Sequence, residues 1–100
     1  MTLLLAGLGS LAPLSGLAGE LSQGAMLSAS CEACHGTNGN SPGTIPSLTG
    51  RSTDYLLKAL AGFKSGERQA TVMGRHVRGY TDEELQLIAE HFAQQNKASE

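Results

Sequence analysis

The most reactive side chains of this 100-residue chain lie within five consecutive positions, in the segment "CEACH". Cys31 and Cys34 are the two cysteines of the sequence, and His35 directly follows the second. Two thiols and an imidazole at this spacing can hold a haem, bind another metal ion, or cycle between dithiol and disulfide. The choice among these three chemistries decides how the rest of the chain is interpreted.

The haem interpretation explains the spacing best. A redox-active CxxC of the thioredoxin kind belongs to a βαβ unit, and nothing in this sequence alternates with period two. A structural zinc site needs four ligands, and the remaining candidates, His76 and His91, lie at spacings that match no zinc pattern. C-x-x-C-H is the pattern of haem c attachment, with thioether bonds to Cys31 and Cys34 and with His35 as axial ligand. A haem-free copper site stays open as an alternative.

Met73 is the favoured second axial ligand. It lies 38 residues after His35 on a segment that we expect to be a loop between two helices. Met26 is only five residues before Cys31, too close to reach the far face of a haem, and is expected to pack in the first helix. His76 competes for the position but is expected to be an exposed loop residue. A His/Met pair is typical of electron carriers with a raised potential.

Several other residues are candidates to support the haem. Pro46, in the loop after the motif, is the expected carbonyl acceptor for the second ring N–H of His35. Arg51 and Arg75 are candidates to pair with the haem propionates through charge-assisted hydrogen bonds. His91 is expected at the surface, beside the apolar face of the last helix.

The helical pattern predicts an all-α domain with three main helices. The first spans about residues 22–34, the second begins at Ser52 or Thr53 and ends near Gly66, and the third follows a "TDEE" capping box at residues 81–84. Apolar residues in the second and third helices recur at i, i+3, i+4 and i+7. The residues expected on the apolar faces are Ala25, Met26, Leu27 and Ala29, then Leu56, Ala59, Leu60 and Phe63, then Leu85, Ile88, Ala89 and Phe92.

The segments between the helices are long and polar. Residues 36–50 are rich in Gly, Asn, Ser and Pro, and residues 65–80 contain one isolated apolar pair. Both are expected to be irregular loops ordered by wrapping one large ligand. Because the chain is short and contains only four aromatic rings, we expect its folding to depend on the haem.

Residues 1–19 resemble a secretory signal peptide in their apolar, small-residue composition, although no Lys or Arg precedes Arg51. This stretch is too short and too rich in Gly and Pro for a comfortable membrane span. We therefore predict a periplasmic cytochrome domain at residues 20–100 with no membrane span in the mature protein. The net charge of −2 gives no support to nucleic-acid binding.

In the order of its motifs, the chain resembles a class I cytochrome c over residues 22–95. The matching segments are "CEACHG", "IPSLTGRSTDYLLKALAGFKSGER", "TVMGR" and "YTDEELQLIAEHFAQQ". The resemblance implies a small fold of three main helices and long loops around one covalent haem, in which the first and last helices cross and Leu27 meets Phe92. It also implies that Cys31, Cys34, His35 and Met73 hold the haem.

The stretch "GFKSGERQATVMGRHVRGYTDEEL" is similar to the haem subunit of flavocytochrome c sulfide dehydrogenase, in particular its single-haem form. That family implies a heterodimer whose FAD-containing flavoprotein subunit oxidises sulfide, while the cytochrome passes electrons to a soluble acceptor and is no enzyme by itself. This chain contains no nucleotide-binding glycine pattern, because its Gly7–Gly9 "GxG" lies in the signal region. The FAD is therefore expected on the partner only, contacted through parts of residues 65–80. The alternative is a free-standing periplasmic mono-haem electron carrier.

Overall fold

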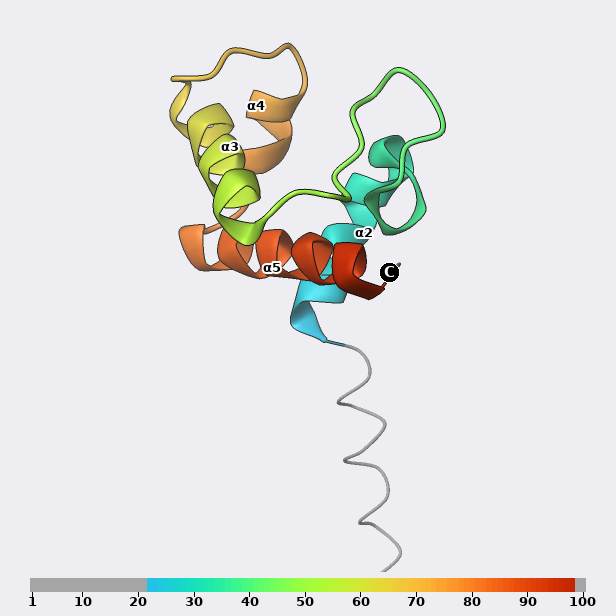
Figure 1. The fold of residues 1–100 in the computed structure, drawn as a ribbon. Coiled ribbons are helices and arrows are strands. Elements are labelled where there is room, and N and C mark those ends of the chain that lie inside the picture. Colours follow the sequence, from blue (N-terminus) through green and yellow to red (C-terminus); the bar gives the residue numbers. More distant parts are fainter. Residues whose placement is uncertain (1–21, 99–100) are drawn as a thin grey trace, which may run out of the picture.

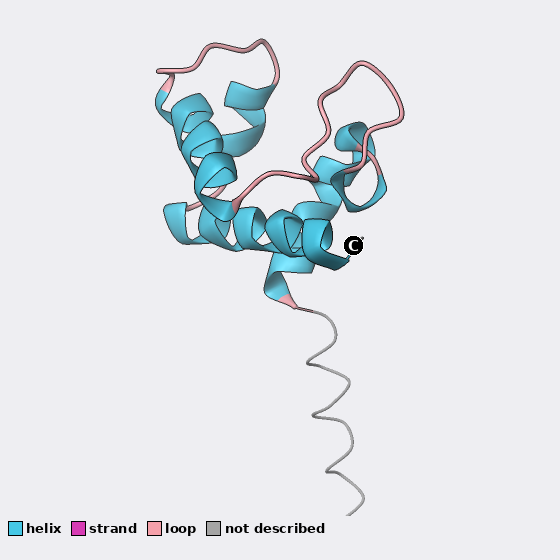
Figure 2. Cartoon of the chain, viewed as in Figure 1, coloured by secondary structure: helices cyan, strands magenta, loops and turns pink. Residues whose placement is uncertain are grey.

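The computed structural model describes residues 22–98, with side chains to residue 95, and this part of the chain is all-α, as predicted (Figures 1 and 2). Its elements are α2 (Gln23–His35), the 3-10 turn η2 (Thr37–Gly39), α3 (Thr53–Ser65), α4 (Met73–Val77) and α5 (Asp82–Ala98). The expected signal peptide, residues 1–19, lies outside the described residues. Between residues 22 and 98, no helix combines the length and apolar character that crossing a membrane requires.

The second predicted helix forms with the expected ends. The Ser52 side chain accepts a hydrogen bond from the backbone N–H of Tyr55 at 3.1 Å, which satisfies one of the free donors at the start of α3. Gly66 ends the helix in the left-handed conformation, with φ at 88°, and its N–H donates to the carbonyl of Gly62. Leu56 is buried on the inner face of α3.

The third predicted helix, α5, supplies most of the core. Its capping box is confirmed, because Thr81 N–H donates to Glu84 Oε1 at 2.9 Å and Glu84 N–H donates to Thr81 Oγ1 at 3.0 Å. The apolar face expected from the sequence is fully buried, and it consists of Leu85, Ile88, Ala89 and Phe92. The predicted period of 3.6 residues therefore places the side chains correctly.

Helices α2 and α5 cross and pack closely, which confirms the crossing of the first and last helices (Figure 1). The approach is tightest at Gly24, where a Cβ atom would lie 2.9 Å from the carbonyl oxygen of Leu87 and 3.5 Å from Cβ of His91. Leu27 is partly buried and packs against the core cluster that contains Phe92. The missing side chain of Gly24 is what allows the two backbones to meet.

The inner face of α2 differs from the one we predicted. Its buried residues are Gly24, Ser28 and Cys31, whereas Met26 is 65% exposed and Ala29 is exposed as well. The expected packing of Met26 inside the first helix is therefore wrong. Small residues face α5 because the helices are too close for large ones.

The segment between α3 and α5 contains a helix that the sequence pattern did not predict. Residues 65–80 were expected to be irregular, but Met73–Val77 form α4, which packs against α3. Five residues cannot form a stable helix alone, and no side chain caps the start of this one. Its stability comes from tertiary packing, above all from Val77, which is 2% exposed.

Candidate haem site

Both thiols lie in the last turns of α2. Cys31 and Cys34 are three positions apart, so they are neighbours on the helix surface, and both are free. Burial raises the pKa of the Cys31 thiol, and the Glu32 carboxylate adds to this rise, whereas a hydrogen bond with Ser30 opposes it. Redox-active CxxC pairs have a lowered thiol pKa, so the raised pKa disfavours dithiol–disulfide exchange.

His35 is the last residue of α2 and is oriented by a backbone oxygen. Its Nδ1 lies 2.6 Å from the carbonyl oxygen of Pro46, which can only accept, so Nδ1 carries the proton and donates. The predicted role of Pro46 as acceptor is therefore confirmed. With Nδ1 engaged in this way, Nε2 is the nitrogen that a metal could use.

The loop after α2 folds back because two glycines allow it. Gly36 has a φ of 92°, and a Cβ atom there would collide with the carbonyl group of Asn40. Gly39 has a φ of 81°, and a Cβ atom there would lie 2.9 Å from the ring of Phe92. The loop is thus held against α5, and its return brings Pro46 to His35. Figure 2 shows this loop and the one after α3 on the same side of the α2–α5 crossing.

Met73 is the first residue of α4 rather than a loop residue. Its side chain is half-buried and packs against the core cluster. A methionine at the start of a short packed helix has a more defined backbone position than one in an open loop. This placement agrees with a role as ligand, although the element that carries it was predicted wrongly.

The two other histidines, His76 and His91, are more buried and make more side-chain contacts than we expected from the sequence. His76 lies in α4, is partly buried, and its Nε2 is 3.3 Å from Ser30 Oγ. His91, expected at the surface, has a side chain only 14% exposed, with Nε2 4.0 Å from a carboxylate oxygen of Glu32. Its ring also packs edge-on against Phe92. Both predictions of exposed histidines are wrong, because neighbouring helices cover the rings.

The arginines expected near the propionates show different environments. The Arg51 guanidinium stacks over the Tyr55 ring, 4.7 Å from its centre. Arg75 is exposed on α4 and makes no ion pair within the described residues. A propionate contact by either arginine stays a prediction.

The chemistry of these side chains fits a covalently bound haem c. The thiols have the spacing of the attachment motif, the imidazole has Nε2 available to a metal, and a soft thioether stands on α4. Within the residues described here, no group of three or more His, Cys, Asp or Glu side chains is placed to hold a metal ion.

Comparison with known sequences agrees with this site. The family model described as cytochrome c matches residues 21–95, so the chain belongs to the cytochrome c family. Fold and motif together define a class I c-type cytochrome, an electron-transfer protein that is not catalytic by itself and whose domain implies covalent haem c.

Three individual relatives show which cytochromes the chain is similar to. The chain is 55% identical over 76 residues to the cytochrome subunit of sulfide dehydrogenase from Chlorobaculum tepidum, covering 76% of this chain and 69% of that protein. It is 40% identical to cytochrome c4 of Pseudomonas aeruginosa over 78% of this chain, but spans only 39% of that relative. It is 34% identical to cytochrome c-554(548) of Halomonas halodenitrificans, covering 78% of this chain and 99% of that protein.

Proposed function

We propose that this chain is the mono-haem electron-transfer subunit of a periplasmic sulfide dehydrogenase. The observation that carries the proposal is its 55% identity, over most of both chains, to a cytochrome subunit of that enzyme. Within the site, Cys31 and Cys34 would form the thioether attachments, and His35 and Met73 would be the two protein ligands of the iron.

Each residue of the site has a defined task. The Pro46 carbonyl holds the His35 ring in one tautomer and orientation, so that Nε2 faces the metal position. Met73 supplies a soft thioether that favours the ferrous state and thereby raises the potential. A haem c bound here supplies a one-electron change at iron.

The partner follows from the electron count. Oxidation of hydrosulfide to sulfur releases one proton and two electrons, whereas a single haem c exchanges one electron at a time. A two-electron cofactor such as FAD on a flavoprotein subunit would match this count, with the electrons passing singly through this chain to two equivalents of a one-electron soluble acceptor. The resemblance to the flavocytochrome family supports this flavoprotein partner.

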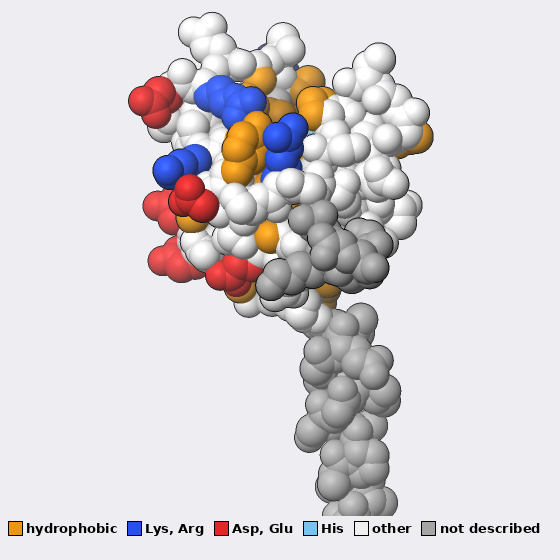
Figure 3. Space-filling model, viewed as in Figure 1, with side chains coloured by type: hydrophobic (Ala, Val, Ile, Leu, Met, Phe, Trp, Pro, Cys, Tyr) orange, Lys and Arg blue, Asp and Glu red, His pale blue; other side chains and the backbone are white. Residues whose placement is uncertain are grey.

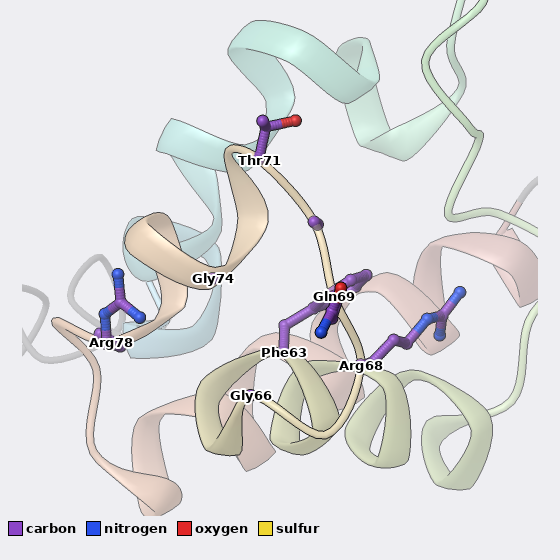
Figure 4. A pocket seen from close by; sticks show the side chains of 8 residues that line it. Phe63, Gly66, Arg68, Gln69, Thr71, Gly74 and Arg78 are labelled. Atoms are coloured by element: carbon purple, nitrogen blue, oxygen red, sulfur yellow. The ribbon is translucent and has the colours of Figure 1, made fainter.

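A surface beside Met73 suits the docking of that partner. An open hollow of about 490 Å³, here called the arginine hollow, lies between the end of α3, the following loop and α4 (Figure 4). Arg68 and Arg78 stand on opposite sides of it, with Phe63 between them. The lining residues are Phe63, Gly66, Arg68, Gln69, Ala70, Thr71, Gly74 and Arg78.

The charges of this hollow suit an acidic partner surface. The Arg68 guanidinium lies over the Phe63 ring at 4.7 Å, and neither Arg68 nor Arg78 has an ion-pair partner among residues 22–95. Carboxylates of the flavoprotein would satisfy them, since like charges are repelled and opposite charges orient the encounter. The first turn of α5 is acidic, and there Asp82 pairs with Lys64 of α3 at 3.1 Å, so this Lys64 charge is already matched within the chain. Figure 3 shows basic and apolar side chains gathered around α3.

The complex is tested by purifying the protein from its native source through its haem absorbance. We expect an FAD-containing chain to copurify and the complex to reduce a soluble acceptor when sulfide is added. Charge reversal by Arg68→Glu and Arg78→Glu should weaken the complex, whereas Lys58→Glu on the exposed face of α3 should leave it intact. If Lys58→Glu weakens it equally, the arginine hollow is not the docking surface.

The axial ligands are tested separately from the partner. Met73→Ala should open a coordination position, lower the potential and admit small ligands such as cyanide. His76→Ala removes the competing imidazole, and the iron should stay low-spin because Met73 remains bound. If Met73→Ala left the spectrum and potential unchanged while His76→Ala altered both, the sixth ligand would be His76.

The free-standing carrier is the second candidate, and one observation favours it. The chain matches 99% of the length of cytochrome c-554(548), a single small cytochrome. The second function would be correct if the protein purifies as a flavin-free monomer. This monomer should also stay oxidised when it is mixed with sulfide and the flavoprotein subunit.

A further inference from the structure

One hydroxyl group connects α2 to the segment that carries Met73. Ser30 Oγ lies 2.8 Å from the Tyr80 hydroxyl and 3.3 Å from Nε2 of His76. The rings of His76 and Tyr80 meet edge-on, with their centres 5.8 Å apart. Within the described residues, every hydrogen bond between α2 and residues 73–80 ends on this serine oxygen.

Tyr80 is fixed from two further directions. Its backbone N–H donates to the carbonyl of Val77 at 3.1 Å, which closes the turn after α4. Its own carbonyl accepts from Lys64 Nζ of α3 at 2.7 Å, and the same ammonium group reaches Asp82 at 3.1 Å. Tyr80 thus joins α3, the end of α4 and α2.

The position of Met73 depends on such external contacts. Five-residue α4 has no side-chain cap and little intrinsic stability, so its place is set by what surrounds it. Val77 anchors its far end in the core, and Ser30 holds it toward the helix that bears the two cysteines. Without the serine bonds, α4 has more freedom to move away from α2.

We propose that Ser30 and Tyr80 are positioning residues that hold Met73 in place as the sixth ligand. The proposal rests on the Met73 ligation proposed above. The hydrogen bond between Ser30 and Tyr80 would stabilise the conformation in which Met73 is bound. It would disfavour the conformation in which the thioether is released and an external ligand takes its place.

The test uses the ferric holoprotein and competition by imidazole for the sixth position. Tyr80→Phe removes the hydroxyl and keeps the ring, so imidazole should bind about 2–10-fold more tightly, as the loss of one hydrogen bond predicts. The thioether-to-iron charge-transfer band should weaken in parallel. Tyr55→Phe is the matched control, because Tyr55 is 44% exposed and its hydroxyl makes no hydrogen bond within residues 22–95.

Three further variants separate positioning from general stability. Ser30→Ala should increase the imidazole affinity as Tyr80→Phe does. The double variant Ser30→Ala/Tyr80→Phe should increase it little further. Ser30→Thr keeps the hydroxyl and should retain the wild-type imidazole affinity. Urea unfolding is measured alongside. If Tyr80→Phe lowers the unfolding midpoint but leaves imidazole affinity unchanged, the positioning role is wrong while Met73 ligation stands. If the wild type lacks the charge-transfer band, both proposals are overturned.

Discussion

Gly24 sets the distance between α2 and α5, and Gly24→Ala tests how tightly the two helices pack. A Cβ atom would lie 2.9 Å from a backbone oxygen of Leu87, closer than real Cβ contacts, and that oxygen cannot rotate away. Overpacking of this kind costs about 1–3 kcal/mol. Alanine gains up to about 1 kcal/mol over glycine in a helix interior, and less in a first turn. We therefore expect a net loss of about 1–2 kcal/mol.

The assay is urea unfolding of the ferric holoprotein, followed by circular dichroism. With a slope of about 1–3 kcal/mol per molar urea, the midpoint should fall by roughly 0.3–2 M. Gly43→Ala is the matched control: no atom lies within 4 Å of its added Cβ, and its φ is not positive. It should unfold at the wild-type midpoint or slightly above. A Gly24→Ala variant as stable as wild type would refute the account of a backbone-limited crossing.

Three other changes test separate parts of the structure. Ser28→Ala should raise the free energy of unfolding by about 1–2 kcal/mol, because the buried Ser28 hydroxyl has no hydrogen-bond partner, and an unchanged or lower value in calorimetry would contradict this. Thr81→Ala should lower it by about 1 kcal/mol through loss of the capping box, and the same variant made on a Glu84→Ala background should show a smaller loss. Apo protein should lack a cooperative thermal transition in far-ultraviolet circular dichroism, because the core is small, and a native-like melt would show that the polypeptide folds without haem.

The sequence predicts those elements whose signals come from residues close together in the chain. The i, i+3, i+4 and i+7 apolar residues of α3 and α5 mark their buried faces, and the Thr81–Glu84 box marks where α5 begins. Pro46 as the partner of His35 was predictable because the ring nitrogen needs an acceptor and the following loop is short enough to supply one.

The sequence pattern could not reveal what depends on distant contacts. Helix α4 has no apolar period and exists because Val77 reaches the core. The inner face of α2 consists of small residues such as Gly24, which carry no hydrophobic signal, so Met26 was placed inward although it is 65% exposed. The bonds of Ser30 to a tyrosine fifty positions away have no signature in either segment.

The acceptor for the His35 ring is a main-chain oxygen, and this affects how the site tolerates sequence change. A carboxylate or amide partner could be deleted by one codon change, whereas every residue at position 46 brings a carbonyl group. What orients the imidazole is therefore the path and length of the loop from Gly36 onward. Apart from Gly36 and Gly39, homologues and designed variants should accept diverse side chains across this loop, yet lose ligand orientation when a single residue is inserted or removed. Insertion scanning, rather than alanine scanning, is the perturbation to which this contact responds.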